Sequence, residues 1–183
     1  MKLIILDRDG VINEDSDAYI KSPAEWIPIP GSLSAIARLN QAGYRVTVAT
    51  NQSGLARGLL SIDLLNAIHN KMNLALANEG GRIDGLFFCP HAPEAGCDCR
   101  KPKPGLLQQI GERFYTRLDN VPCVGDSLRD LQAAMAVGAA PILVRTGKGS
   151  VTESEPQLNP SIPVYDDLSA VVDALLNQEN LQP

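Results

Sequence analysis

The sequence lacks any apolar stretch of the roughly 18 residues that a membrane-spanning helix requires, and it lacks an excess of positive charge. Sixteen Lys and Arg residues stand against 21 Asp and Glu residues, which gives a formal net charge of −5 at pH 7. Nucleic acids and anionic membranes are bound by clustered cations. We therefore expect neither as a partner, and we expect any phosphorylated ligand to depend on locally placed cations or a metal ion.

We also expect no export signal, because the apolar run at the N-terminus meets charge at Asp7 and is too short for the core of a signal peptide. We therefore expect a cytoplasmic protein. The chain has only four cysteines. In a reducing compartment, metal ligation explains clustered cysteines better than disulfide bonds do.

The chain has 183 residues, of which 44% are hydrophobic and 20% charged, close to an ordinary soluble protein. This length predicts one domain over residues 1–183, and we expect a monomer. Short apolar runs alternate with longer helical patterns, without internal repeats. That alternation predicts an α/β fold, a doubly wound parallel sheet with helices on both faces.

The predicted strands are Lys2–Leu6, Tyr44–Ala49, Gly85–Cys89, Val121–Val124, Pro141–Val144 and a weaker one at Pro163–Tyr165. The predicted helices are Ser32–Gln41, Ser61–Asn78, Gly105–Tyr115, Leu128–Val137 and Leu168–Asn177. Residues 147–163 are rich in Pro, Gly, Ser and Glu and are predicted to form a surface loop. The connections after the first two strands have space for one helix each, not for a second folded domain.

Polar residues follow three of the predicted strands: Asp7 and Asp9 after the first, Thr50 after the second and Asp126 after the fourth. In a doubly wound sheet the carboxyl ends of the strands form the ligand-binding edge. Each Asp alone could simply end a strand or cap a helix, but three at one edge favour a site. Carboxylates gathered in one pocket repel each other unless a cation joins them, and Mg²⁺ suits oxygen ligands and phosphate together.

Four ordered segments carry a resemblance to a known family. They are DRDGVIN (7–13), TNQSG (50–54), RKPKPG (100–105) and GDSLRD (125–130). In this order they resemble the four motifs of the haloacid-dehalogenase-like (HAD-like) phosphohydrolases, which implies the HAD-like Rossmannoid sheet. Four motifs in order are far more specific than a lone Asp-x-Asp.

The resemblance implies a role for each matching residue. Asp7 corresponds to the nucleophile that forms an aspartyl-phosphate, and Asp9 to the general acid and base. Thr50 and Lys101 correspond to the hydroxyl and the cation that contact the transferred phosphoryl group. Asp126 corresponds to the carboxylate that holds Mg²⁺ together with Asp7 and the backbone carbonyl of Asp9.

A second cluster consists of Cys89, His91, Cys97 and Cys99, four soft ligands within eleven residues. Three thiolates and one imidazole form a closed set for tetrahedral Zn²⁺, which indicates a structural site. The segment contains two prolines and a glycine, so it is predicted to be a loop without a core to bury cysteines. The alternative, a set of reactive surface thiols, suits a cytosolic enzyme poorly.

This zinc-binding loop insertion resembles that of one HAD-like subfamily, the D-glycero-D-manno-heptose-1,7-bisphosphate phosphatases and the related histidinol-phosphate phosphatases. Those proteins lack a separate cap domain, which matches the short connections noted above. Without a cap, loops must select the substrate. The predicted substrate contacts are Asn51, Gln52, Ser53, Arg57, Arg100, Asp15, Asp17 and Tyr19. Among them Arg100 is expected to bind the substrate end remote from the reacting phosphate, because guanidinium matches phosphate oxygens bidentately.

Four further residues near the motifs have open or ordinary interpretations. Asp130 either supports the metal site or is an exposed Asp in a first helical turn. Arg8 is expected to face away from the two aspartates, toward packing or solvent. His69 is expected to be a helix-surface or packing residue. Ser127 stands where some members of the subfamily have Lys, so the anomer preference at C1 stays open.

The favoured hypothesis is a Mg²⁺-dependent phosphatase that removes the C7 phosphate of heptose 1,7-bisphosphate, a step in ADP- or GDP-heptose and lipopolysaccharide core biosynthesis. The alternative with the same chemistry is histidinol-phosphate phosphatase, whose cationic substrate favours an acidic recognition loop over Arg100. An alternative of another class is a non-catalytic phosphoacceptor or zinc-stabilised binding module. Asp9 argues against that class, because a group placed to protonate a leaving oxygen has no use without turnover.

Overall fold

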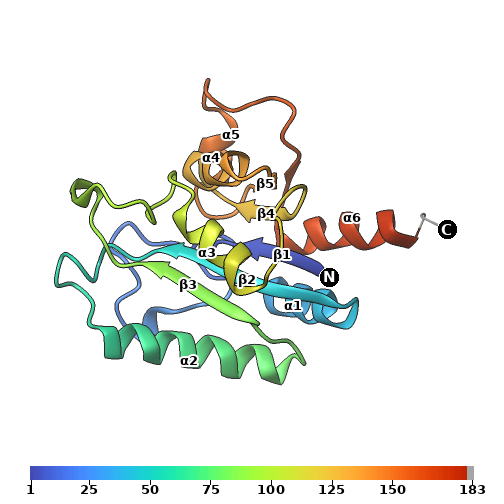
Figure 1. Ribbon diagram of the computed structural model, residues 1–183. Helices are drawn as coiled ribbons and strands as arrows, with labels where there is room; N and C mark the ends of the chain where they lie inside the picture. Colours follow the sequence, from blue (N-terminus) through green and yellow to red (C-terminus); the bar gives the residue numbers. More distant parts are fainter. Residues whose placement is uncertain (181–183) are drawn as a thin grey trace.

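The computed structural model describes residues 1–180 as a parallel sheet with helices on both faces (Figure 1). The strands are β1 (Lys2–Leu6), β2 (Tyr44–Asn51), β3 (Gly85–Cys89), β4 (Pro122–Gly125), β5 (Ala140–Val144) and β6 (Val164–Tyr165). The α-helices are α1 (Ser32–Gln41), α2 (Ile62–Asn78), α3 (Gly105–Arg113), α4 (Leu128–Ala136), α5 (Gly149–Glu153) and α6 (Leu168–Asn180), and two 3-10 turns are η1 (Pro23–Glu25) and η2 (Pro93–Ala95).

The sheet has the strand order β3-β2-β1-β4-β5-β6, and all its pairings are parallel. β1 therefore lies in the middle, paired with β2 on one side and with β4 on the other. The chain proceeds outward from β1 in both directions, so a crevice opens at the carboxyl ends of β1 and β4. The predicted doubly wound parallel sheet is confirmed.

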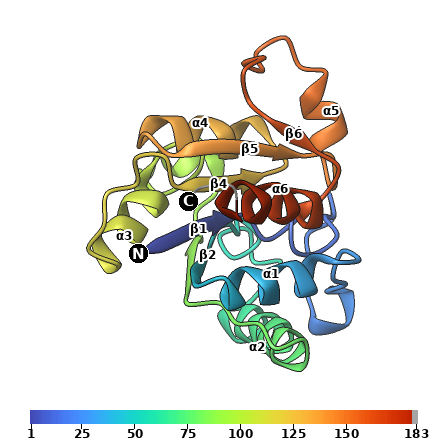
Figure 2. The same ribbon diagram turned by 90° about the vertical axis from the view of Figure 1, so that its right-hand side faces the viewer.

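The alternation of side chains along β1 fills two apolar layers. Ile4 and Leu6 belong to a core packed against α1, α2 and α6, whereas Leu3 and Ile5 belong to a core packed against α3 and α4. Figure 2 shows α4 on one side of the strands and α1 and α6 on the other. Both faces of the central strand are buried, which explains its uninterrupted apolar sequence.

Most predicted element boundaries agree with the structure to within one or two residues, and two differences have clear causes. β2 continues past Ala49 because Asn51 still pairs in register with Cys89 of β3. The predicted surface loop 147–163 contains the short helix α5, so that prediction was wrong in part. The hydroxyl of Thr152 in α5 is buried and donates a hydrogen bond to the carbonyl of Asp126 at 2.8 Å, which ties α5 to the end of β4.

Within residues 1–180, one helix and the turn η1 separate β1 from β2, and one helix separates β2 from β3. The described chain therefore has no separate cap domain, as predicted. The extent of a single domain over residues 1–183 stays a prediction, and residues 181–183 lie outside the described part. No helix in that part combines the length and the apolar character needed to cross a bilayer.

Candidate active site

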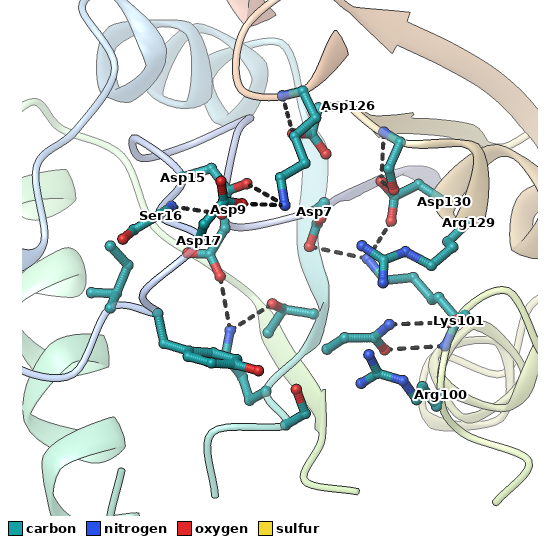
Figure 3. Close-up of a pocket in the computed structure, with 18 residues that line it drawn as sticks. Asp7, Asp9, Asp15, Ser16, Asp17, Arg100, Lys101, Asp126, Arg129 and Asp130 are labelled. Carbon is teal, nitrogen blue, oxygen red and sulfur yellow. Dashed lines mark hydrogen bonds and ion pairs between the residues drawn. The ribbon is translucent and has the colours of Figure 1, made fainter. Parts of the chain in front are cut away.

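A cavity of about 200 Å³ opens at the carboxyl ends of β1, β2 and β4 (Figure 3). The residues predicted for the site that line it are Asp7, Asp9, Asp15, Asp17, Tyr19, Thr50, Asn51, Gln52, Ser53, Arg100, Lys101 and Asp126. Ser16, Ile20, Ser127, Arg129, Asp130 and Lys148 also line it. Apart from Tyr19 and Ile20, these lining residues are all polar or charged, so the cavity suits a hydrophilic ligand.

Lys101 joins two of the carboxylates. Its ammonium group lies 3.0 Å from Asp7 and 2.6 Å from Asp130 (Figure 3). It also donates to the carbonyl of Ala49 at 2.6 Å. Lys101 and Asp130 are each 4% exposed. Burial alone lowers the pKa of a lysine, but the two carboxylates raise the pKa of Lys101 above its ordinary value. The cation therefore stays charged at the base of the cavity.

Asp130 is not the exposed residue that one interpretation of the sequence allowed. Its second oxygen accepts hydrogen bonds from the hydroxyl of Ser127 at 2.6 Å and from the Ser127 backbone N–H at 3.1 Å, forming a capping box at the start of α4. Burial raises the pKa of a carboxyl, but Lys101 and these hydrogen bonds hold the pKa of Asp130 below its usual value. Asp130 is therefore an anion that neutralises Lys101, and Ser127 is engaged in fixing it.

Asp7, Asp126 and Asp130 present carboxylate oxygens that all lie within 4.8 Å of one another. Burial, followed by the charges of Asp130 and Asp7, raises the pKa of Asp126 to about 8. Burial raises the pKa of Asp7 to about 7 despite the attraction of Lys101. Such a cluster of hard oxygen donors is unfavourable without a cation, and its chemistry fits Mg²⁺.

Two glycines leave room for the Asp126 carboxylate. Gly10 and Gly147 both have positive φ angles, +81° and +57°, and a side chain at either position would collide with Asp126. The backbone N–H of Lys148, the next residue, donates to Asp126 at 2.8 Å. The loops after β1 and β5 therefore form a close-fitting cradle that orients this carboxylate.

The Asp9 carboxylate is held by three side chains. Arg8 donates to its two oxygens at 3.0 Å each, Asn13 donates at 2.8 Å and Gln52 at 3.0 Å. The expectation that Arg8 faces away from the aspartates was wrong, because its fully buried guanidinium folds back onto Asp9. His69 is 8% exposed, and its Nε2 lies 3.2 Å from Arg8.

The TNQSG segment serves partly to hold its neighbours. The side chain of Asn51 accepts from the N–H of Lys101 and donates to its carbonyl, both at 3.1 Å. Gln52 donates to the hydroxyl of Thr50 at 2.9 Å as well as to Asp9. Asn51 and Gln52 thus line the cavity while fixing catalytic candidates, and their predicted role as substrate contacts stays a prediction.

The charges at the mouth of the cavity are separated. Figure 3 shows Asp15 and Asp17 on one side of Asp7, and Arg100 and Arg129 on the other. Lys148 lies 3.0 Å from Asp17 and 3.4 Å from Asp15, so the acidic side is partly neutralised. An anionic end of a ligand is attracted to the side of the two arginines.

Arg57 is the one predicted substrate contact that does not line the cavity. Its side chain is exposed and does not reach the lining. It lies in a turn, where the N–H of Arg57 donates to the carbonyl of Ser53 and the N–H of Gly58 donates to the carbonyl of Leu55, both at 3.1 Å. Arg57 therefore lies outside the cavity lining, and its role as a substrate contact stays a prediction.

The zinc ligands converge as the sequence predicts. Their ligand atoms lie within 4.8 Å of one another. The Sγ atom of Cys89 lies 3.7 Å from Cys97 and 3.1 Å from Cys99, and Nδ1 of His91 lies 3.5 Å from Cys89 and 3.3 Å from Cys99. Sulfur ligands about 2.3 Å from a tetrahedral zinc are about 3.8 Å apart. The Cys89–Cys97 and Cys97–Cys99 separations of 3.7 and 3.6 Å are close to this value and the Cys89–Cys99 pair is closer, so the donor set is compatible with Zn²⁺.

Lys148 and Arg129 are site residues that the sequence analysis missed. Lys148 follows the predicted fifth strand, whose carboxyl end belongs to the same edge of the sheet as the motifs. That position was a usable signal. Arg129 lies inside the fourth motif, but its exposure at the mouth depends on how α4 begins and carries no sequence signature of its own.

Comparisons with known proteins agree with this site. A HAD-hydrolase-like family model matches residues 98–171. The D-glycero-β-D-manno-heptose-1,7-bisphosphate 7-phosphatase of Bordetella bronchiseptica is 58% identical over 97% of this chain and 99% of its own length. The enzyme of the same name from Pseudomonas aeruginosa is 55% identical over 95% of this chain and 97% of its own.

Solved structures show the same relationship. The B. bronchiseptica D,D-heptose 1,7-bisphosphate phosphatase, crystallised with magnesium and phosphate, superposes with a TM-score of 0.95 over 97% of this chain and 99% of its own, at 58% identity. The corresponding phosphatase of Burkholderia thailandensis gives a TM-score of 0.77 at 49% identity, over 96% and 99% of the two chains. This chain therefore belongs to the D-glycero-β-D-manno-heptose-1,7-bisphosphate 7-phosphatase family of HAD-like hydrolases.

Proposed function

We propose that this protein hydrolyses the C7 phosphate of D-glycero-β-D-manno-heptose 1,7-bisphosphate through an aspartyl-phosphate on Asp7. The observation that carries the reaction class is that Asp7 faces the cavity beside Lys101, with Asp9 held at the same cavity wall. The sugar and its β anomer rest on the high identity to the relatives that bear this name. The product belongs to the route toward ADP- or GDP-heptose and the lipopolysaccharide core.

In the first step the Asp7 carboxylate attacks phosphorus, and the bond from phosphorus to the C7 oxygen breaks. Asp9 donates its proton to that oxygen, which leaves as the sugar hydroxyl. Lys101 and the hydroxyl of Thr50 stabilise the charge of the phosphoryl group in transfer. In the second step Asp9 takes a proton from water, which attacks phosphorus and frees Asp7 and inorganic phosphate.

Mg²⁺ held by Asp7, Asp126 and the Asp9 carbonyl, with Asp130 beside them, would neutralise phosphate charge as the anionic nucleophile approaches. Zn²⁺ bound by Cys89, His91, Cys97 and Cys99 would have a structural role, since these four ligands close its coordination. The zinc ligands directly precede Arg100 and Lys101 in sequence. The thiol ligands fit the expectation of a reducing cytoplasm.

The C1 phosphate is assigned to the side of the cavity that carries Arg100 and Arg129. Arg100 also donates to the carbonyl of His91 at 3.2 Å, so the zinc loop helps to orient it. Two guanidinium groups bind a second phosphate well, because their charge is opposite to its own and their geometry matches its oxygens. They would repel the cationic amine of histidinol phosphate. This feature favours the bisphosphate over the histidinol-phosphate alternative.

Phosphate release from a substrate panel tests the proposal. The panel contains the β and α anomers of heptose 1,7-bisphosphate, heptose 7-phosphate and histidinol phosphate, each with Mg²⁺ and with a chelator. We expect the β bisphosphate to exceed histidinol phosphate in kcat/KM by at least about tenfold, equivalent to about 1.4 kcal/mol of transition-state stabilisation. We also expect the activity to require Mg²⁺.

Asp7→Asn is the matched control, because it removes the nucleophile and nearly preserves the shape of the site. It should abolish phosphate release from every ester. A preference for histidinol phosphate would reject the sugar assignment and leave the reaction class intact. Turnover by Asp7→Asn at the parental rate would reject the aspartyl-phosphate.

A further inference from the structure

Arg8 is a charged side chain in the interior that the proposed chemistry does not use. Its exposure is 0%, and it is among the largest fully buried side chains of the described chain. An isolated guanidinium in such a place is strongly unfavourable unless it is paired and hydrogen-bonded. The carboxylate that pairs with it is Asp9, whose side chain is 21% exposed at the cavity.

The Arg8–Asp9 contact uses two nitrogens of the guanidinium. Nε lies 3.0 Å from Oδ1, and Nη2 lies 3.0 Å from Oδ2 and 2.9 Å from Oδ1, so Arg8 holds both oxygens of the carboxylate. Asn13 and Gln52 donate to the same two oxygens from other directions. Asp9 follows the end of β1 in a loop, and these side chains fix its orientation.

His69 of α2 fixes Arg8 in turn. Its Nε2 lies 3.2 Å from Nη1 of Arg8. A guanidinium has donors only, so Nε2 must accept this hydrogen bond, with the ring neutral and its proton on Nδ1. Burial and the charge of Arg8 lower the pKa of His69 to about 4, which is consistent with a neutral ring. No residue of α2 lines the cavity. The helix is nevertheless connected to Asp9, because His69 contacts Arg8 and Arg8 contacts Asp9.

We propose that Arg8, anchored by His69, is a positioning residue that aims the Asp9 carboxyl group at the leaving oxygen of the substrate. The proposal rests on the role of Asp9 as general acid in the proposed function. It assigns to His69 a role in the reaction although His69 touches neither the substrate nor the metal site. The acceptor atom of His69, and not merely the volume of its ring, is the feature required.

The nature of the leaving group separates this role from a structural one. An alkyl phosphate leaves as an alkoxide that requires a proton, whereas p-nitrophenyl phosphate leaves as a stabilised phenolate that does not. The value of kcat/KM reports the steps up to departure of the leaving group, before Asp9 acts as a base. A misdirected Asp9 therefore harms alkyl esters selectively, whereas a loosened fold harms both classes equally.

The test compares His69→Phe, which keeps a ring but removes the acceptor, with His69→Gln, whose amide oxygen can accept from Arg8. The alkyl substrate is the one in the panel that the parent enzyme hydrolyses fastest, so the test does not depend on the sugar assignment. We expect His69→Phe to lower kcat/KM for the alkyl ester by at least about tenfold and for p-nitrophenyl phosphate by less than about threefold. His69→Gln should return the alkyl rate to within about threefold of the parent.

Arg8→Lys, which keeps the charge but loses the contact of two nitrogens with both Asp9 oxygens, should show the same selective loss for alkyl esters. If His69→Phe does not fold, as judged by circular dichroism, His69→Leu serves as the variant without an acceptor. Equal losses for both ester classes, or a His69→Gln enzyme no better than His69→Phe, would overturn the proposal. A parent enzyme inactive on every ester would instead reject the proposed function.

Discussion

The ammonium group of Lys101 is shared by the carboxylates of Asp7 and Asp130 at the base of the cavity. All three groups are largely withdrawn from water. Removing one partner of a buried ion pair typically costs about 3–5 kcal/mol, because the remaining charge is left without compensation. The arrangement therefore makes Lys101 important for folding as well as for contact with phosphate.

Arg100 provides a prediction at the scale of the single residue. Arg100→Ala should raise KM for the β bisphosphate about 10- to 100-fold, since a hydrogen bond to a charged group contributes about 1.5–3 kcal/mol. KM for heptose 7-phosphate, which lacks the C1 phosphate, should change little. Steady-state kinetics on the two substrates measure the difference.

Arg57→Ala is the matched control for Arg100→Ala, because Arg57 is an exposed arginine outside the cavity lining. It should leave both KM values near those of the parent. If Arg100→Ala raised KM equally for both substrates, Arg100 would shape the site without binding the C1 phosphate.

The sequence was sufficient to predict the location of single residues where a motif labels them. Asp7, Asp9, Lys101 and Asp126 all line the predicted edge of the sheet. It was insufficient for Arg8, because an alternating strand pattern predicts opposite directions for neighbouring side chains. The turn at Gly10, which has a positive φ angle, breaks that pattern. The long side chain of Arg8 folds so that its guanidinium contacts Asp9.

Among the elements, the loop between β3 and α3 carries the four predicted zinc ligands, whose side chains lie close together. Cys89 ends β3, and Cys99 directly precedes Arg100 and Lys101. The backbone of Lys101 is bonded on its other side by Asn51. Arg100 and Lys101 therefore lie between the Cys/His cluster on one side and the Asn51 contact on the other.

Loss of zinc should lower activity even when Mg²⁺ is saturating. Cys99→Ser weakens the cluster next to Arg100, so we expect kcat/KM for the β bisphosphate to fall at least about tenfold, in the range of effects from misplaced catalytic groups. Metal analysis should find zinc equimolar with the parent chain and depleted in the variant.

Cys123→Ala, which removes a cysteine outside the cluster, should retain zinc. Full activity in a zinc-free Cys99→Ser protein would contradict the positioning role.

The elements themselves were predictable to the extent that local pattern decides them. β1 and α1 have the predicted boundaries because apolar periodicity and turn residues agree there. α5 was missed because Gly149, Ser150 and Thr152 are weak helix formers. Its contact with Asp126 is a tertiary one that no local pattern reports.

On the scale of the whole molecule, the strand order brings together acids from distant parts of the chain. Asp7 follows β1 and Asp126 follows β4, and these strands are neighbours although more than a hundred residues separate them. The metal-free protein must keep these carboxylates together against their mutual repulsion. The cost of doing so depends on pH.

We expect the stability of the magnesium-free protein, with its zinc site loaded, to fall as pH rises from 7 to 8. The pKa values of Asp7 and Asp126 are raised to about 7 and about 8 from an ordinary 3.8. In this range the folded state binds more protons than the unfolded state, so the free energy of unfolding decreases with pH. The pKa of His69 is lowered to about 4 from 6.5. Its contribution therefore makes the free energy of unfolding rise with pH, but only below about pH 6.5, outside this range.

Calorimetry in magnesium-free buffer, with the zinc site left loaded, measures this trend, and added Mg²⁺ should raise Tm most at the alkaline end. Asp126→Asn should flatten the pH dependence, because it removes one of the two titrating groups. A magnesium-free Tm that is constant or rises between pH 7 and 8 would contradict the electrostatic account.

The polar lining of the cavity has a consequence for medicinal chemistry. A competitive inhibitor that enters it meets aspartates, arginines and lysines, and finds little apolar surface beyond Tyr19 and Ile20 to bury. Its affinity must come from anionic groups that imitate phosphate, and such groups hinder passage through lipid membranes. Compounds aimed at this enzyme therefore need a masked acid or an uptake route of their own.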